Sequence, residues 1–321
     1  MSLKNKRILV TGGAGFIGSN LVEQLLNNGA FVRVLDNLAT GNQKNLESFL
    51  NHPNFEFIEG DIRVFEDCQK AVQNIDCVSH QAALGSVPRS IDFPELTHEV
   101  NATGFLNMLR AVKEAGIKRF VYASSSSVYG DSTVSPKVIG SEGNLLSPYA
   151  VSKHINEEYA KVFHRLFGIE TIGLRYFNVF GPNQDPNGVY AAAIPKFVDA
   201  MIKGTKIVIN GDGEQSRDFT FVKNAVEANI LGLSCENEVA FGNVYNVACN
   251  QSFTLNQVIA AIKEELIKQD KFNDAVEISY GPDRAGDIRN SLADISITKR
   301  DLNYTGSISF NEGISRYLNK L

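Results

Sequence analysis

The chain has 321 residues, of which 43% are hydrophobic, and it carries a formal net charge of −5 at pH 7. We expect one large α/β domain with a smaller region attached, because a chain of this length buries a sizeable core. The acidic balance and the lack of a basic run argue against binding to nucleic acid or to an anionic membrane. No segment reaches about 18 uninterrupted apolar residues, and the start of the chain shows no signal-peptide pattern, so we expect a cytoplasmic protein.

The cysteines and histidines show no spacing typical of a metal site. Cys68, Cys77, Cys235 and Cys249 form no CxxC pair, and the five histidines form no HExxH motif or His/Cys cluster. Two of the cysteines lie in apolar stretches. We therefore expect buried, reduced thiols and no bound metal.

The first expected elements are a strand, a glycine-rich turn and a helix. Arg7–Thr11 (RILVT) is a short apolar stretch, GGAGFIG follows it, and apolar residues then recur at helical spacing. Gly12 permits a sharp turn, Gly15 lets the backbone approach a pyrophosphate, and Gly18 lets the helix pack closely on the strand. A purely structural turn would show the same glycines, so the next elements decide between the two interpretations.

A second strand and an acidic residue favour a dinucleotide site. Phe31–Leu35 (FVRVL) is followed by Asp36, at about the sequence distance at which a carboxylate meets the adenosine ribose. This carboxylate would accept hydrogen bonds from both ribose hydroxyls and repel a 2′-phosphate. The only nearby basic side chain is Arg33, inside the strand. The sequence therefore predicts NAD rather than NADP.

Further strands and helices alternate along the chain. We expect strands at Phe55–Glu59, Cys77–His80, Phe120–Ala123 and Glu170–Leu174, and a helix at Val100–Ala115. This alternation predicts an α/β fold with a Rossmann-type doubly wound parallel sheet, in which ligands bind beyond the carboxyl ends of the strands.

The alternation becomes irregular after about Phe180. Loops are expected at Gly181–Gly188 and Asn210–Arg217, and a helix at Thr254–Gln269. We interpret residues 1–179 as an NAD-binding domain. Residues 180–321 would form mainly a smaller carboxyl-terminal substrate-binding lobe, with some chain returning to the first domain.

A tyrosine and a lysine are the candidate proton-transfer residues. Tyr149 and Lys153 in YAVSK are four residues apart and share one face of a helix. A tyrosine with its usual pKa of about 10 is a poor base, but a lysine ammonium and a nicotinamide cation nearby favour its phenolate. A tyrosine packed at a helix start after Pro148 would show the same spacing. The serine run Ser124–Ser127 adds hydroxyls at the same sheet edge, of which Ser125 is expected to bind the reacting oxygen.

Taken together, the motifs resemble those of extended short-chain dehydrogenases/reductases that act on nucleotide sugars, and most closely those of UDP-N-acetylglucosamine 4-epimerases. The resemblance covers essentially the whole chain and rests on GGAGFIG, DNLATG, EGDIR, HQAALGSVPRS, YASSSSVYGD, SPYAVSK, LRYFNVFG, QDPNGVYAAAIPK, INGDGEQSRDF and RNSLADI. It implies NAD-dependent interconversion of UDP-N-acetylglucosamine and UDP-N-acetylgalactosamine through a transient 4-keto sugar, with UDP-glucose and UDP-galactose as further candidate substrates. It also implies a homodimer formed by the helices at Val100–Ala115 and Tyr149–Phe167.

The resemblance assigns roles to individual residues. The catalytic set is Ser125, Ser126, Tyr149 and Lys153. The cofactor set is Gly12, Gly15, Phe16, Ile17, Asp36, Asn37, Gly41, Asp61, Ile62, Gln81, Ala82, Ala83, Asn101, Tyr149, Lys153 and Tyr176. The substrate set is Ser86, Ser125, Asn178, Ala192, Arg217, Arg284, Asp287 and Ser291. Within it, the two arginines would bind the diphosphate, because guanidinium groups match phosphate oxygens.

The residues after the catalytic hydroxyl separate reactions within the superfamily. Dehydratases of this type carry an Asp-Glu pair there and decarboxylases a glutamate, whereas this chain has Ser126 and Ser127. Elimination and decarboxylation would lack their acid or base, so the resemblance favours epimerisation. UDP-glucuronate and UDP-N-acetylglucosaminuronate 4-epimerases remain an alternative, because a similar serine run occurs among uronate epimerases. A net dehydrogenase or dehydratase, and a catalytically idle NAD-binding sensor, are the alternatives from other classes.

Ser291 bears on the choice of sugar. In RNSLADI it matches a position in the hexose pocket where epimerases restricted to UDP-glucose and UDP-galactose often carry tyrosine, and those that accept N-acetylated sugars carry a small residue. The resemblance thus implies an N-acetylhexosamine. The alternative is an exposed serine that caps a helix beginning at Leu292. Departures from the closest relatives at Gly181–Asn183 and Pro136–Asn144 leave the preferred sugar open.

Overall fold

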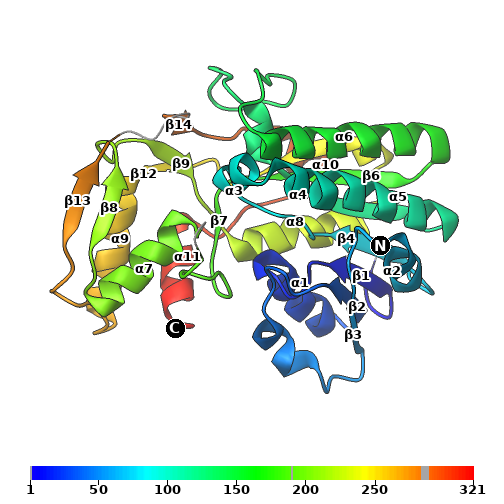
Figure 1. Ribbon diagram of the computed structural model, residues 1–321, viewed down its shortest axis with the longest axis horizontal. Coiled ribbons are helices and arrows are strands. Elements are labelled where there is room, and N and C mark those ends of the chain that lie inside the picture. Colours follow the sequence, from blue (N-terminus) through cyan, green and yellow to red (C-terminus); the bar gives the residue numbers. More distant parts are fainter. Residues whose placement is uncertain (1, 189–190, 283–288) are drawn as a thin grey trace.

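A seven-stranded sheet forms the centre of the computed structural model, which describes residues 2–188, 191–282 and 289–321. Its strand order is β11 (Asn243–Val247), β6 (Glu170–Tyr176), β5 (Arg119–Ser125), β4 (Cys77–His80), β1 (Arg7–Thr11), β2 (Phe31–Asp36) and β3 (Phe55–Glu59), and all neighbours are parallel (Figure 1). The order reverses between β1 and β4, the switch point at which such sheets bind ligands. The expected Rossmann-type fold is confirmed.

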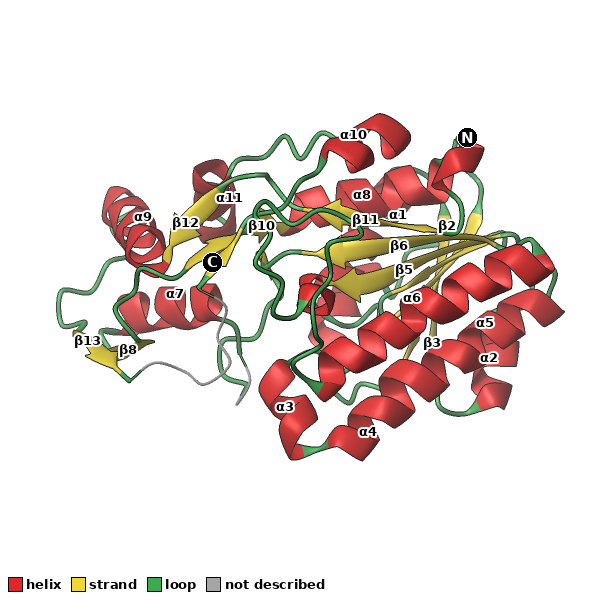
Figure 2. Cartoon of the chain, turned by 90° about the horizontal axis from the view of Figure 1, so that it is seen from above, coloured by secondary structure: helices red, strands yellow, loops and turns green. Residues whose placement is uncertain are grey.

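Helices cover both faces of the sheet (Figure 2). One face carries α1 (Phe16–Asn27) and α8 (Val222–Ser234), and the other carries α2 (Phe65–Ala71), α5 (Gly104–Glu114) and α6 (Pro148–Phe167). Two short helices, α3 (Val87–Asp92) and α4 (Pro94–His98), pack against α6. Short 3₁₀ helices lie at Gln43–Phe49, Ser126–Tyr129 and Glu238–Ala240.

The remaining elements form a smaller part beside the carboxyl ends of the sheet (Figure 1). Its strands are β7 (Val179–Phe180), β8 (Ile207–Asn210), β9 (Ser216–Asp218), β10 (Thr220–Phe221), β12 (Ser252–Thr254), β13 (Ile278–Gly281) and β14 (Asn290–Ser291). Its helices are α7 (Ala193–Lys203), α9 (Leu255–Lys268) and α11 (Phe310–Leu318), and α10 (Ser296–Leu302) lies against α8 and β11. The chain after residue 180 therefore contributes α8 and β11 to the layers of the central sheet.

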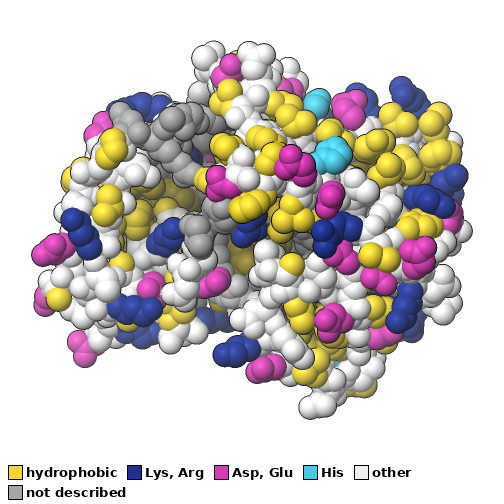
Figure 3. Space-filling model, viewed as in Figure 1, with side chains coloured by type: hydrophobic (Ala, Val, Ile, Leu, Met, Phe, Trp, Pro, Cys, Tyr) yellow, Lys and Arg dark blue, Asp and Glu magenta, His cyan; other side chains and the backbone are white. Residues whose placement is uncertain are grey.

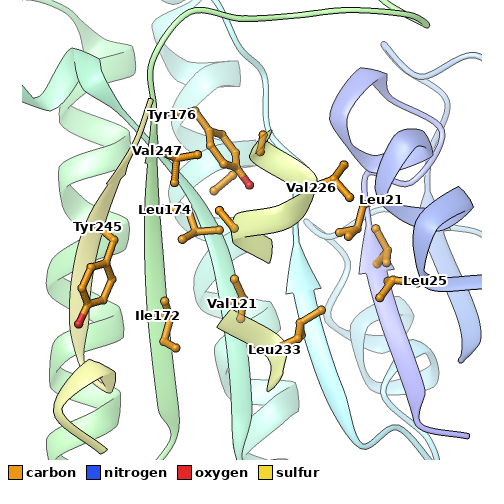
Figure 4. Packing of buried hydrophobic residues seen from close by; sticks show 14 of the residues in the cluster. Leu21, Leu25, Val121, Ile172, Leu174, Tyr176, Val226, Leu233, Tyr245 and Val247 are labelled. Atoms are coloured by element: carbon orange, nitrogen blue, oxygen red, sulfur yellow. The ribbon is translucent and has the colours of Figure 1, made fainter. Parts of the chain in front are cut away.

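Apolar residues on both sides of the sheet account for its stability. Figure 4 shows the cluster under α8, which includes Leu21, Leu25, Val121, Ile172, Leu174, Val226, Leu233 and Val247. A second cluster beneath α5 contains Phe105 and Phe120, and the smaller part has its own core around Phe180 and Phe310. Burial of such side chains is the main favourable contribution to folding.

Two strands are longer than the apolar pattern predicts. We expected ends at Ala123 and Leu174, but β5 and β6 continue to Ser125 and Tyr176. Their parallel register pairs Ser124 with Arg175 and Ser125 with Tyr176, so the backbone remains hydrogen-bonded where the side chains become polar. The predicted ends were wrong because buried partners satisfy these polar side chains.

The helix expected at Val100–Ala115 also begins differently. Helical backbone starts at Pro94 in α4, continues through a π turn at Glu99–Thr103, and reaches α5 only at Gly104. By contrast, the expected helix near Thr254 agrees closely with α9. Its first residue follows Thr254, which forms a capping box with Gln257. Among the described residues, none of the helices has the length and apolar character needed to cross a bilayer.

Truncating a core residue under α8 tests the packing of the sheet. Leu174 is fully buried in β6, so Leu174→Ala should lower the free energy of unfolding by about 2–5 kcal/mol. Val239→Ala, at a side chain 63% exposed, should change it by less than about 0.5 kcal/mol. Urea denaturation of both variants measures the difference, and similar losses in both would contradict this assignment of the core.

Candidate functional site

The glycine-rich turn between β1 and α1 is shaped by close backbone contacts. Gly12 has a φ of +68°, and a Cβ there would lie 2.7 Å from the Ala82 nitrogen. A Cβ at Gly18 would lie 2.1 Å from the Gly12 oxygen, so α1 packs against the turn only with glycine at this position. Gly15 precedes the first residue of α1 and offers no side-chain cap. The free N–H groups at this helix end suit a phosphate group.

A cavity of about 430 Å³ lies at the carboxyl ends of the central strands. It gathers almost the whole expected cofactor set: Gly12, Gly15, Phe16, Ile17, Asp36, Asn37, Gly41, Asp61, Ile62, Gln81, Ala82, Ala83, Tyr149, Lys153 and Tyr176. These residues come from loops that are distant in sequence and meet because the strands are parallel. The glycines and the carboxylates together provide a site that fits a dinucleotide.

Asn101 is the expected cofactor residue that does not line this cavity. It lies in the π turn with 1% of its surface exposed. Its Oδ1 accepts from the Leu84 nitrogen at 2.8 Å, and its Nδ2 donates to the Leu84 oxygen at 3.1 Å and to Ser152 Oγ at 3.1 Å. Asn101 therefore supports the loop after β4, whose residue Leu84 does line the cavity.

Asp36 lies at the end of β2 with only 8% of its surface exposed. Its carboxylate accepts from the Ala14 nitrogen and from the Leu38 nitrogen, each at 2.9 Å. Burial raises the pKa of this carboxyl, and the two backbone hydrogen bonds oppose the rise. Because each carboxylate oxygen accepts more than one hydrogen bond, Asp36 keeps the capacity to bind ribose hydroxyls.

Arg33 lies inside β2, as expected, but a basic residue that the sequence analysis did not name lines the cavity. Arg33 is 7% exposed and donates to Glu56 and to the backbone oxygens of Ala71 and Gln73. Arg63 lines the cavity instead. It forms a 2.7 Å ion pair with Asp61, which lowers the pKa of that carboxyl to about 2. Its place in EGDIR, two residues after Asp61, is the signal that the sequence reasoning overlooked.

The candidate proton-transfer residues lie on α6. Ser147 caps this helix by accepting from the Ala150 nitrogen at 3.1 Å, and Tyr149 and Lys153 then face the cavity. Lys153 Nζ donates to the Ala123 oxygen at 2.8 Å and lies 6.0 Å from the centre of the Tyr149 ring. Burial lowers the pKa of Lys153 to about 8, opposed by the charge of Glu157.

The hydroxyl groups of Tyr149 and of the serine run lie close together. Burial raises the pKa of Tyr149, and a hydrogen bond from Ser125 opposes this rise by favouring the phenolate. Ser125 Oγ also accepts from the Ser127 nitrogen at 3.1 Å. Ser125 and Ser126 are half-buried and are not among the residues that line the first cavity, whereas Ser124 is. Ser124 donates to Glu157 Oε1 at 2.5 Å.

A network of hydrogen-bonded polar side chains lies beneath two of the residues that line the cavity, Tyr176 and Gln81. Tyr176 donates to Gln81 Oε1 at 3.0 Å and accepts from Asn229 Nδ2 at 2.7 Å. Asn229 Oδ1 in turn accepts from Gln81 at 2.9 Å and from Ser79 at 3.0 Å. The sequence reasoning missed Asn229, because it lies on α8, in the part of the chain assigned to the second lobe. In the described part of the chain, no three His, Cys, Asp or Glu side chains are grouped as metal ligands.

A second cavity of about 420 Å³ lies in the smaller part. Three expected substrate residues, Asn178, Ala192 and Arg217, line it. Arg217 Nη1 donates to the Ser216 oxygen at 2.8 Å and to the Arg289 oxygen at 3.3 Å. Aromatic residues and a glutamine complete the lining, so the cavity offers both apolar surface and a guanidinium group.

The remaining substrate residues lie near these cavities or outside the described ranges. Ser291 is 9% exposed in β14 and pairs in parallel register with Arg217. The interpretation of Ser291 as an exposed helix cap is wrong, because α10 begins only at Ser296. Ser86 caps α3 with a φ of +109° and accepts from the Arg89 nitrogen at 3.3 Å. Arg284 and Asp287 lie in 283–288, outside the described residues.

Comparisons with known proteins find relatives along nearly the whole chain. The chain is 39% identical to a UDP-N-acetylglucosamine 4-epimerase from Methanobrevibacter ruminantium M1, solved with UDP-N-acetylmuramic acid, with a TM-score of 0.89 and 98% of each chain covered. It is 33% identical over 313 residues to a UDP-glucose 4-epimerase of Mycolicibacterium smegmatis, covering 97% of this chain and 96% of the relative.

A third relative is a UDP-glucuronic acid 4-epimerase from Bacillus cereus, solved with UDP-glucuronic acid and NAD. It is 30% identical, with a TM-score of 0.87 and 98% of each chain covered. The model of the NAD dependent epimerase/dehydratase family matches residues 8–248, which include the glycine-rich turn, Asp36, Tyr149 and Lys153. The chain therefore belongs to this family of NAD-dependent enzymes that act on nucleotide sugars.

Proposed function

We propose that the protein is a 4-epimerase that interconverts UDP-N-acetylglucosamine and UDP-N-acetylgalactosamine, with UDP-glucose and UDP-galactose as further substrates. The observation that carries this proposal is the arrangement beside the cavity of Tyr149, Ser125 and Lys153. Ser125 hydrogen-bonds Tyr149, and Lys153 Nζ lies 6.0 Å from the centre of the Tyr149 ring. Ser125 is followed by Ser126 and Ser127 rather than by carboxylates. A reaction that only removes and returns a proton and a hydride at one carbon needs no further acid or base.

In the proposed reaction Tyr149 carries the proton. Its phenolate would accept the proton of the sugar 4-hydroxyl and later return it, while Ser125 hydrogen-bonds the same oxygen. The Lys153 ammonium would stabilise the phenolate, because an opposite charge nearby favours the ionised form. Bound NAD supplies the hydride acceptor and donor. Asp36, Gly12 and the other residues of the first cavity would hold it.

The second cavity is our candidate site for the UDP group. Its apolar and aromatic surface suits a uracil ring, and Arg217 suits the diphosphate. Asn178, whose Nδ2 donates to the Asp218 oxygen at 3.3 Å, and Ala192 would contact the nucleotide. We also assign Arg284 and Asp287 to this site, on the resemblance to the family alone. Firm binding of the diphosphate would keep the ketose intermediate on the enzyme while its sugar ring rotates to present the opposite face to the cofactor.

The preference for an N-acetylated sugar rests on Ser291. This small residue is buried beside Arg217, where a larger side chain would compete with the sugar for space. The relative from Methanobrevibacter ruminantium, solved with an N-acetylated nucleotide sugar, supports this choice. The relative from Bacillus cereus, solved with UDP-glucuronic acid, keeps a uronate substrate as the second candidate.

We further propose that the functional protein is a homodimer in which α5 and α6 pack against their copies. Hydrophobic side chains gather on the face around α3 to α6, as Figure 3 shows, and include Ile91, Phe93, Leu166 and Phe167, each at least 40% exposed. In the same proposal residues 1–179 hold NAD and residues 180–321 mainly hold the UDP-sugar.

Incubation of the purified protein with UDP-N-acetylglucosamine separates the proposed function from its alternatives. An epimerase would yield UDP-N-acetylgalactosamine with no net NADH. A dehydrogenase would accumulate NADH, a dehydratase would yield a dehydrated keto sugar, and an NAD-binding sensor would leave the substrate unchanged. Parallel reactions with UDP-glucose and UDP-glucuronate would rank the three sugars.

The cofactor assignment predicts that the protein purifies with NAD. Asp36→Ala should lower the NAD content per chain, because each charge-assisted hydrogen bond to the ribose contributes about 1.5–3 kcal/mol. Glu59→Ala is the matched control, since Glu59 is exposed and pairs in register with Asp36 on the neighbouring strand. Acid extraction followed by chromatography measures the content. A predominance of NADP, or an equal loss in both variants, would contradict the assignment.

The proton-transfer role predicts a selective loss of turnover. Tyr149→Phe should reduce kcat by about 10²- to 10⁴-fold while leaving the NAD content and the melting temperature near those of the wild type. Tyr159→Phe removes a hydroxyl from an exposed tyrosine of the same helix and should have no effect. Ser125→Ala should cost less than Tyr149→Phe. An unchanged rate for Tyr149→Phe would remove this residue from the mechanism.

The specificity role predicts a substrate-dependent effect at Ser291. Ser291→Tyr should fill the space for the acetamido group, and an overpacking cost of about 1–3 kcal/mol corresponds to a roughly ten- to hundredfold loss of kcat/KM on UDP-N-acetylglucosamine. Activity on UDP-glucose should persist. Ser296→Tyr, at an exposed serine five residues later, is the control. Equal losses on both sugars for Ser291→Tyr would show that this residue does not set the specificity.

A further inference from the structure

In the described part of the chain, three arginines on strands of the central sheet form ion pairs with glutamates, and one of the three differs from the others. Arg33–Glu56 joins β2 to β3 and Arg119–Glu170 joins β5 to β6, each at 2.8 Å with the glutamate more than 30% exposed. The third pair, Arg175–Glu157, joins β6 to α6 at 2.7 Å, and its side chains are only 4% and 7% exposed. It lies at the end of the sheet that carries the catalytic residues.

The carboxylate of Glu157 connects three elements. It pairs with Arg175 through two hydrogen bonds, from Nε to Oε1 at 2.8 Å and from Nη2 to Oε2 at 2.7 Å. It also accepts the Ser124 hydroxyl at 2.5 Å. Ser124 and Arg175 are register partners on β5 and β6, so one carboxylate holds α6 against both strands. Glu142 provides a second carboxylate for the Arg175 guanidinium.

The same carboxylate is placed to act on the catalytic lysine. Glu157 follows Lys153 by four residues on α6, and therefore lies one turn along the same face. The carbonyl that accepts from Lys153 Nζ belongs to Ala123, the residue before Ser124 on β5. The position of the lysine thus depends on the contact between α6 and β5 to which Glu157 contributes.

We propose that Glu157 and Arg175 are positioning residues for Lys153 and Tyr149. This inference rests on the proposed function. Their buried ion pair holds the catalytic helix in register with the ends of β5 and β6, and the Glu157 carboxylate supplies the negative charge that faces the lysine ammonium. Neither residue needs to touch the substrate. Burying two charges without water is unfavourable unless their hydrogen bonds are complete, which accounts for the additional partners Ser124 and Glu142.

Other titratable groups lie close to Lys153, Glu157 or Arg175. Tyr122 on β5 interacts with the charges of Glu157 and Arg175, and Tyr129 in the turn after β5 and Glu142 in the following loop interact with Arg175. His80 on β4 interacts with the charge of Lys153, Tyr149 lies beside Lys153 on α6, and Tyr176 follows Arg175 on β6. Burial and the charge of Lys153 lower the pKa of His80 to about 3, so His80 is neutral at pH 7. Burial raises the pKa of each of these tyrosines. Glu157 is therefore the group that opposes the effect of burial on Lys153.

The direction of the pH effect follows from this arrangement. Turnover requires the Lys153 ammonium, so activity is present below the pKa of Lys153 and is lost as the pH rises through it. That pKa is already lowered to about 8 by burial, and the Glu157 charge opposes the lowering. Removing the charge would lower it further, and the Arg175 cation, left with only Glu142, would add to the effect. The alkaline limb of the activity profile should then move to lower pH.

The test compares kcat and KM in wild type and two variants between about pH 5.5 and about pH 9.5, a range that includes the pKa of about 8 of Lys153 and lower values. Glu157→Gln should move the alkaline limb of kcat down by about one pH unit or more and lower kcat at pH 7 at least about tenfold, with KM changed less than about threefold. Glu170→Gln breaks the comparable ion pair at the opposite end of β5 and β6 and should leave the limb in place.

A further variant at position 157 separates the effect of the carboxylate charge from the effect of its position. Glu157→Asp keeps the charge but shortens the side chain, so the limb should stay near that of wild type while kcat falls. If Glu157→Gln does not fold, Glu157→Asp decides alone, because a wild-type kcat there would overturn the proposal. An unshifted limb in folded Glu157→Gln, or an equal shift in Glu170→Gln, would also overturn it.

A direct titration makes the outcome independent of turnover. The ¹³Cε signals of labelled lysines, with Lys153 assigned by its loss in Lys153→Arg, report the ionisation of this residue in each variant. A lower titration midpoint in Glu157→Gln than in wild type is expected, and an unchanged or higher midpoint would overturn the electrostatic part. If the wild type does not epimerise any of the three sugars, the proposed function fails while this titration still judges the contact between Glu157 and Lys153.

Discussion

Parallel hydrogen bonding between neighbouring strands is the constraint on which the rest of the molecule depends. It places the carboxyl ends of β1, β2, β4, β5 and β6 at one edge, so that loops from distant parts of the sequence open into one cavity. The reversal of strand order between β1 and β4 leaves space above this edge. The glycine-rich turn lies at that edge because it follows β1, and Asp36 lies there because it is the last residue of β2. The start of α6 lies there because this helix packs against β5 and β6.

Buried polar groups give this edge its chemistry. Lys153 donates to the Ala123 carbonyl, and the charge of Glu157 opposes the lowering of its pKa by burial. Tyr176 is hydrogen-bonded to Gln81 and Asn229. Burying either side chain alone would cost free energy, and its hydrogen-bond partners offset that cost. The same arrangement keeps the side chains that face the cavity in one orientation, which the proposed proton transfer from a sugar hydroxyl would require.

The two cavities are formed by different parts of the chain, yet the parts are not independent. The chain from Val222 to Val247 leaves the smaller part, contributes α8 and β11 to the layers of the central sheet, and returns through β12. Arg217 and Ser291 lie side by side because β9 and β14 pair in parallel. The elements of the candidate nucleotide site are thereby attached to the same sheet against which α6, the helix with Tyr149 and Lys153, packs.

The sequence by itself determined the parallel sheet, the glycine-rich turn, Asp36 and the spacing of Tyr149 and Lys153, because these features arise from local periodicity and from residues within one or two turns of each other. Only the tertiary structure decided the contacts between distant segments. It extended β5 and β6 through Ser125 and Tyr176, because the buried Glu157 satisfies polar side chains that the apolar pattern would place in a loop. It placed Arg63 in the lining of the cavity and buried Ser291 beside Arg217, because the loops and strands that meet there are far apart in the sequence.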